Sequence, residues 1–281
     1  MKLKQKLAIK FIRLKFKILT IFSIRKTAEK AFELFCTPFF KTVNKEPAIF
    51  KSGEGLKFSL DGILIKGYRW NKDNEHKILI LHGFGSAAHN FHHYVTSFIA
   101  KGYQVLAFDA PAHGISGGAT VNAMQYGQMI EQINKLYGPI NSFLAHSFGG
   151  MALSLALENI SHDENTKIVF IAPATETTTA IDEAFKLLQI KNKAVRAAFD
   201  SIIFEKSGHP TVWFSIKRAI INIKAKILWI HDEDDDITPL TDALQVKSLN
   251  LKHVQFIITK GLGHRKIYRD ITIKNIAIDF L

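Results

Sequence analysis

The sequence predicts an α/β fold in which a mostly parallel β-sheet is flanked by helices and a helical segment is inserted late in the chain. From about Pro47 onward, short β-rich apolar runs alternate with helical stretches, which is the pattern of strand–helix–strand units. The alternation is interrupted once, over residues 175–222. A chain of 281 residues with 47% hydrophobic content can bury one large core, so no second core is required.

The first expected element is an antiparallel hairpin over residues 56–70. Its turn is predicted at Asp61-Gly62, because this dipeptide readily takes the positive φ angles of a tight turn. Six apolar runs then predict buried strands, at residues 77–82, 103–108, 140–145, 167–172, 226–231 and 253–258. Helices are expected between and after these strands, at about 91–100, 121–137, 149–159, 239–249 and 265–280.

Residues 175–222 have helical periodicity and many large apolar side chains, but no run that predicts a strand. We interpret them as a helical cap over the C-terminal edge of the sheet, where open α/β sheets bind ligands. An extra helical layer without a role in binding is the alternative. The predicted organisation is an N-terminal helical segment over 1–45, a first part of the core over 46–174, the cap over 175–222 and a second part of the core over 223–281.

The net charge of +12 is concentrated at the N-terminus, where residues 1–30 hold ten Lys or Arg residues and one acidic residue. Lys6, Lys10, Arg13 and Lys17 recur at helical spacing among apolar residues, which predicts a basic amphipathic helix. The charges interrupt every apolar stretch, which argues against a signal peptide and against a membrane-spanning helix. Two interpretations stay open: the helix contacts an anionic membrane surface, or it packs its apolar side on the main domain.

Cys36 is the one cysteine, so no intrachain disulfide can form, and no Cys/His cluster has the spacing of a zinc site. A reducing compartment follows, and we expect a cytoplasmic protein, at the inner face of the membrane if its N-terminal helix binds lipid. No nucleic-acid partner is expected, because the positive charge belongs to the N-terminal segment. Nothing in the sequence indicates an oligomeric state.

Ser147 lies where the strand predicted over 140–145 gives way to a helix that begins near Phe148. A sharp strand-to-helix turn that exposes a nucleophilic serine needs small residues on both sides. Gly149 supplies one of them, and Ala145 stands where Gly-x-Ser-x-Gly has its first glycine. A serine that only caps the following helix is the alternative.

A nucleophilic serine needs a base that takes its proton and an acid that orients the base. Candidates follow later in the chain, at the ends of two predicted strands. The acidic run 232–236 follows strand 226–231, and His264 follows strand 253–258. Serine, acid and histidine therefore occur in the chain order of a nucleophile-elbow hydrolase.

Five motifs together resemble the α/β-hydrolase superfamily and occur in its order: His82 to Ser86, Asp109 to Ser116, Ala145 to Gly150, His231 to Pro239, and Gly263-His264. The resemblance spans residues 82–264 and implies the α/β-hydrolase fold, with Ser147 as nucleophile and His264 as general base. Aligning the acid loop of the superfamily on His231 and Pro239 implies Asp235 as the orienting acid. Asp232 stands where that loop usually has glycine, and Asp234 stays open as the acid.

The resemblance also implies an oxyanion hole made by the main-chain N–H groups of Phe84 and Phe148. No organic cofactor is expected, because the loop at 82–86 lacks the further glycines and the acid of a dinucleotide site. The acidic run is a weak candidate for a cation such as calcium, and we expect no metal. Four other histidines are interpreted as structural: His92, His93, His113 and His146.

The sequence therefore predicts a serine hydrolase that cleaves a carboxylic ester or thioester through an acyl-enzyme on Ser147. The apolar content of the predicted cap indicates a small-molecule ester with a sizeable apolar part. A serine nucleophile excludes the dehalogenases and epoxide hydrolases that use aspartate. Lipases, peptidases and acyltransferases of the same fold stay open, as does a catalytically inactive binding protein at a membrane surface.

Overall fold

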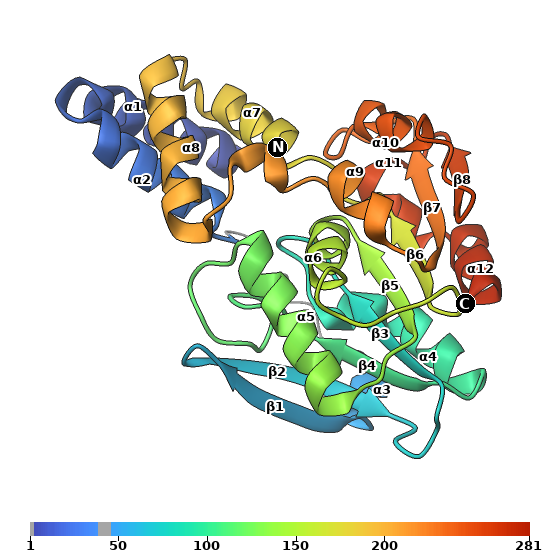
Figure 1. Ribbon diagram of the computed structural model, residues 1–281. Helices are drawn as coiled ribbons and strands as arrows, with labels where there is room; N and C mark the ends of the chain where they lie inside the picture. The colour runs from blue at the N-terminus through green and yellow to red at the C-terminus, as the bar shows by residue number, and fades with distance from the viewer. Residues whose placement is uncertain (1–2, 39–45) are drawn as a thin grey trace. The chain divides into compact units, whose positions relative to one another are not determined.

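The computed structural model describes residues 3–38 and 46–281, and side chains from Leu7 onward. Lys2, residues 39–45 and the side chains of Lys4 and Lys6, all in the expected N-terminal segment, lie outside the described residues. The chain forms two compact units (Figure 1). The larger unit comprises Pro38–Thr175 and Ser215–Leu281, and the smaller one comprises Glu176–Phe214 with the described residues up to Thr37.

The larger unit is built on an eight-stranded sheet with the order β1-β2-β4-β3-β5-β6-β7-β8. Its strands are β1 (Glu54–Leu60), β2 (Ile63–Trp70), β3 (Lys77–Leu81), β4 (Gln104–Phe108), β5 (Ser142–His146), β6 (Lys167–Ile171), β7 (Lys226–Asp232) and β8 (Val254–Thr259). β2 pairs antiparallel with both β1 and β4, and all other neighbours are parallel. The predicted mostly parallel α/β sheet is confirmed.

The predicted hairpin is β1–β2, with Leu60 opposite Ile63. Its turn residues, Asp61 and Gly62, both have positive φ, at 47° and 78°, as a two-residue hairpin loop requires. The central strands β3, β4 and β5 are buried almost throughout, which is why they occur in the sequence as continuous apolar runs rather than as alternating ones.

Helices cover both faces of the sheet in the larger unit (Figure 1). On one face, α4 (His92–Ala100) and α12 (Ile271–Phe280) contact each other and enclose a core that includes Phe98, Leu144 and Ile278. On the other face, α6 (Phe148–Ala156) contacts α5 (Ala123–Tyr137) and α9 (Ile216–Ala219). The remaining helical elements of this unit are α3 (Ala48–Lys51), η1 (Ala88–Phe91), η3 (Ile220–Asn222), α10 (Leu240–Lys247), α11 (Gly263–Lys266) and η4 (Ile267–Arg269).

The smaller unit is helical in its described part: α1 (Leu3–Phe22), α2 (Ile24–Phe35), α7 (Thr177–Leu188), α8 (Lys193–Ser207) and η2 (Thr211–Trp213). Phe199 of α8 is fully buried, and its ring lies 5.2–5.9 Å from the rings of Phe185, Phe32 and Phe35. Asn192 caps the start of α8 by accepting from the Ala194 N–H. No helix among the described residues is long and apolar enough to cross a membrane.

The segment predicted as a cap, residues 175–222, contributes to both units. Its helices α7, α8 and η2 belong to the smaller unit, whereas α9 and η3 belong to the larger one. The helices of the smaller unit pack in pairs formed by remote parts of the chain, since α1 contacts α7 and α2 contacts α8. That residues 175–222 cover the C-terminal edge of the sheet stays a prediction.

Candidate active site

Ser147 occupies a strained turn between β5 and α6. Its φ of 53° and ψ of −121° lie in a region that residues other than glycine rarely adopt. The turn is held in place because the Ser147 N–H donates to the carbonyl of Ile171 and the Ser147 carbonyl accepts from the N–H of Ala174. The sheet thus imposes a backbone conformation that a serine acting only as a helix cap does not need.

Two glycines let the main chain pass close to this turn. A β-carbon at Gly149 would lie 2.8 Å from the carbonyl oxygen of His82, so only glycine lets α6 start this close to the end of β3. A β-carbon at Gly83 would lie 2.8 Å from Cβ of Ser147. The loop after β3 therefore runs directly beside the serine.

Three residues from separate parts of the larger unit form a hydrogen-bonded chain. Nε2 of His264 lies 3.0 Å from Oγ of Ser147, and Nδ1 of His264 lies 2.8 Å from Oδ2 of Asp235. All three residues are buried, with 7–8% of their surface exposed. They follow strands β5, β7 and β8, whose carboxyl ends meet at one edge of a parallel sheet.

The surroundings of Asp235 keep its carboxyl ionised. Burial by itself raises the pKa of Asp235, but hydrogen bonds from His264 and from the main-chain N–H groups of Thr238 and Ile237 outweigh burial, so the pKa lies below its ordinary value. The Thr238 hydroxyl also donates to Oδ2 of Asp235 over 2.9 Å. A negative charge is thereby fixed beside Nδ1 of His264.

The acidic run around Asp235 is divided among different hydrogen-bonding roles. Asp234 accepts from the N–H of Gly261 and does not contact His264. Asp232 is fully buried, and its two oxygens accept from the Thr259 hydroxyl and from the N–H groups of Asp234, Leu262 and Gly263. Asp232 thus anchors the loop that leads into His264.

Two histidines support the site from inside the core. His231 donates from Nε2 to the carbonyl of Thr238 over 2.7 Å, which fixes the loop that carries Asp235. The Nε2 of His146 contacts the carbonyl of His264 over 3.2 Å, and its ring stacks at a tilt against Tyr268. Burial lowers the pKa of both imidazoles, that of His146 well below its ordinary value. Both rings are therefore neutral near neutral pH.

The loop that carries Phe84 is tied to the segment after β4. The N–H of Gly85 donates to Nε2 of His113 over 2.8 Å, and the N–H of Ala88 donates to Oδ1 of Asp109 over 2.7 Å. The ring of Phe84 packs edge-on against the ring of Phe148, with centroids 5.7 Å apart. The two candidate oxyanion donors thus belong to residues that contact each other.

Sequence reasoning named Ser147, Asp235 and His264, and the structure brings these three side chains together. It missed the supporting roles of Thr238, His231 and Asp232 in holding them. Asp232 stood out in the sequence only as an acid in the place of a glycine. No group of three His, Cys, Asp or Glu side chains among the described residues is arranged to hold a metal ion.

Comparisons with known proteins agree with this architecture. The family model described as serine aminopeptidase, S33, matches residues 72–208, just under half of the chain. No curated protein matches the sequence significantly.

Three solved structures illustrate the likeness in fold. An esterase of Pyrococcus furiosus is 18% identical, with a TM-score of 0.63 over 88% of this chain and 96% of that chain. An esterase of a Rhodococcus species is 16% identical, with a TM-score of 0.56 over 82% of this chain and 100% of that one. A thioesterase domain from the curacin biosynthetic pathway is 13% identical, with a TM-score of 0.57 over 80% and 99% of the two chains. At these identities the likeness is one of fold.

Proposed function

We propose that this chain, a member of the α/β-hydrolase superfamily, is a serine hydrolase that cleaves a carboxylic ester or thioester through an acyl-enzyme on Ser147. The observation that carries the proposal is the unbroken hydrogen-bonded chain from Oγ of Ser147 through the imidazole of His264 to Asp235. Such a chain joins a weak nucleophile, a base and an orienting acid.

In the proposed reaction, Nε2 of His264 takes the hydroxyl proton of Ser147 as Oγ attacks the carbonyl carbon of the substrate. The imidazolium then gives this proton to the leaving alcohol or thiol as the acyl-enzyme forms. Water, deprotonated by His264, releases the acid and restores the serine. Asp235 stays ionised throughout, because its low pKa keeps the proton on Nδ1 of His264.

Attack on a carbonyl creates an oxyanion that needs hydrogen-bond donors placed in advance. We assign this role to the main-chain N–H groups of Phe84 and Phe148. The close approach of Gly83 to Ser147 and the position of Phe148 directly after the serine support the assignment. The bond from Gly85 to His113 would keep the first donor fixed during the reaction.

The surroundings of the serine favour an apolar substrate. Phe84 is 41% exposed although it contacts Phe148 beside the serine, and Ile237, in the loop after Asp235, is 50% exposed. Apolar side chains that stay in contact with water next to a reactive group favour an apolar ligand. We therefore propose an ester with an apolar acyl or alcohol part.

A fluorophosphonate probe tests the proposal, because it reacts covalently with activated serines. We expect wild-type protein to be labelled on Ser147, and a Ser147→Ala variant to remain unlabelled. His264→Ala should also abolish labelling, whereas Ser154→Ala, a change at a buried serine of α6 away from the triad, should not. Folded wild-type protein that takes up no probe, or equal labelling of Ser147→Ala, would refute the mechanism and favour a binding protein.

A panel of esters and thioesters with graded acyl length then defines the substrate. We expect hydrolysis to rise from acetyl to longer acyl groups, because each buried methylene contributes roughly 0.8 kcal/mol. Equal rates for all acyl lengths would contradict the apolar substrate and leave the serine mechanism intact.

A further inference from the structure

We propose that α1 of the smaller unit binds the surface of an anionic lipid bilayer through an apolar face that is exposed to solvent. Leu7, Phe11, Leu14, Ile18 and Phe22 are each 49–80% exposed. Their spacing of three or four residues places them along one side of the helix. Large apolar side chains that are exposed in a continuous row mark an interaction surface.

The opposite side of α1 already has its packing partners. Phe16 is buried at 6% exposure, and Ile12 and Leu19 are half-buried beside it. These residues lie on the side of the helix that contacts α2 and α7. Packing inside the smaller unit therefore uses one apolar side of α1 and leaves the second one free, so the alternative that the helix only packs its apolar side on the protein does not account for both.

Lysines border the exposed row on both sides. At 100° per residue, Lys10 and Lys17 lie along one border of the row, and Lys15 lies along the other. All three are exposed, and none forms an ion pair with a described residue. The sequence of α1 contains no acidic residue. An apolar stripe between cations complements a bilayer, whose apolar interior lies beneath an anionic surface.

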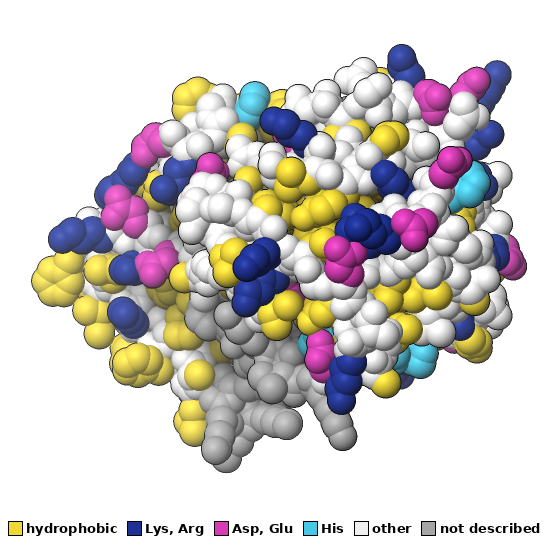
Figure 2. All heavy atoms as spheres, turned by 90° about the horizontal axis from the view of Figure 1, so that it is seen from below, with side chains coloured by type: hydrophobic (Ala, Val, Ile, Leu, Met, Phe, Trp, Pro, Cys, Tyr) yellow, Lys and Arg dark blue, Asp and Glu magenta, His cyan; other side chains and the backbone are white. Residues whose placement is uncertain are grey.

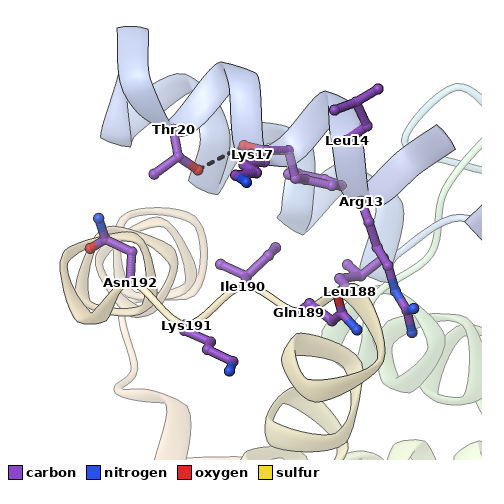
Figure 3. A pocket seen from close by; sticks show the side chains of 10 residues that line it. Arg13, Leu14, Lys17, Thr20, Leu188, Gln189, Ile190, Lys191 and Asn192 are labelled. Carbon is purple, nitrogen blue, oxygen red and sulfur yellow. Dashed lines mark hydrogen bonds between the residues drawn. The ribbon is translucent and has the colours of Figure 1, made fainter. Parts of the chain in front are cut away.

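A hollow of about 330 Å³ adjoins the border formed by Lys17 (Figure 3). It lies between α1 and the connection from α7 to α8, and it combines cations with apolar side chains. Its lining includes Arg13, Lys17 and Lys191 together with Leu14, Leu188 and Ile190. Leu14 belongs both to the hollow and to the exposed row, so an anionic headgroup in the hollow would sit beside acyl chains in contact with the row.

Charge decides between a bilayer and a second copy of the chain. Two copies that met through this face would bring lysines against lysines, and no acidic residue of α1 could pair with them. Figure 2 shows hydrophobic side chains interspersed with Lys and Arg at the left-hand end, the end that carries α1 and α2 in Figure 1. Such a helix lies in the plane of the interface instead of crossing the membrane.

Co-sedimentation of the full chain with lipid vesicles tests the proposal. Wild-type protein should pellet with vesicles of phosphatidylglycerol and phosphatidylcholine, pellet much less with pure phosphatidylcholine, and be released by salt. Phe11→Glu combined with Ile18→Glu should lower the partition coefficient at least about tenfold. Lys10→Gln combined with Lys17→Gln should lower it about tenfold on anionic vesicles and leave the helix fold undisturbed.

A matched control replaces two exposed apolar residues of the larger unit. Ile221→Glu combined with Ile271→Glu changes side chains that are 61% and 60% exposed, and should bind vesicles like wild type. Circular dichroism checks that the helices persist in each variant. Binding that is insensitive to both α1 double variants, or no binding by wild type, overturns the proposal. So does a wild-type dimer, seen by size-exclusion chromatography with light scattering, that the Phe11→Glu and Ile18→Glu changes convert to a monomer.

Discussion

The two units of this protein differ in what they bury. The larger unit buries ionisable side chains in a connected network, in which Asp232, Asp235 and His264 each make several hydrogen bonds. In the described part of the smaller unit, the buried polar residues are two threonines, Thr27 and Thr211, and the core is aromatic. Buried charge requires bonding partners that a helical aromatic core does not supply.

This difference indicates a division of labour. The carboxyl ends of the parallel strands in the larger unit hold polar side chains at fixed positions, which is what acyl transfer requires. The smaller unit offers a surface of apolar and basic side chains, which is what attachment to lipid requires. Chemistry and attachment should therefore be separable by mutation.

The sharpest break of the comparison is Asp235→Asn. This change removes the charge beside Nδ1 of His264 and favours the wrong tautomer, so we expect kcat to fall about 10⁴-fold. Asp234→Asn is the matched control, because Asp234 bonds to Gly261 and not to His264, and it should keep most of the activity. Steady-state ester hydrolysis measures both; a larger loss for Asp234→Asn would reverse the assignment of the acid.

Phe199→Ala tests whether the smaller unit can be weakened by itself. Removing this fully buried ring from its cluster of aromatic partners should lower the free energy of unfolding by about 3–5 kcal/mol. Urea unfolding followed by circular dichroism gives this value. Fluorophosphonate labelling of Ser147 in the absence of urea should persist, and its loss would show that the two units are not separable.

Asp232→Asn tests the support of the catalytic loop within the larger unit. The amide keeps one acceptor but points N–H groups at donors such as Leu262 or Gly263, so we expect about 2–3 kcal/mol of destabilisation together with a lower kcat. Asp236→Asn is the control, since Asp236 is exposed. If both variants unfold at the same urea concentration, Asp232 does not anchor the loop.

The smallest expected effect is a dependence of stability on pH that originates in the larger unit. Burial lowers the pKa of His82 to about 4, so the folded state binds fewer protons than the unfolded state between that pKa and the ordinary histidine value. Stability should therefore fall by about 2 kcal/mol from about pH 7 to about pH 5. His146 and His231, whose pKa values are also lowered, act in the same direction. Urea midpoints that do not change over this range would contradict the prediction.

Most of the fold could be predicted from the sequence. The apolar runs located the strands to within a few residues, because a buried parallel strand must be apolar on both faces. Asp61-Gly62 located the hairpin turn, because few dipeptides tolerate two positive φ angles. Helix ends were less accurate: the last helix was expected from residue 265, but α12 begins at Ile271, where the Asp270 side chain caps it.

The site divides in the same way. Ser147, Asp235 and His264 could be named from motifs, because strand ends and small residues leave a signal in a linear sequence. The roles of Thr238, His231, Asp232 and His146 could not, because they depend on hydrogen bonds between segments whose registers the sequence does not specify. Polar residues near an active loop look alike until their partners are known.

By itself, then, the sequence determined the order of strands and helices, the class of nucleophile and the basic character of the first helix, since these follow from local pattern and composition. Only the tertiary structure decided that Asp235 and not Asp234 contacts His264, that Asp232 anchors the loop before it, and which side of α1 stays exposed. The reason is physical: pattern identifies what a residue can do, whereas hydrogen-bond distance and burial depend on remote segments that meet only when the chain folds.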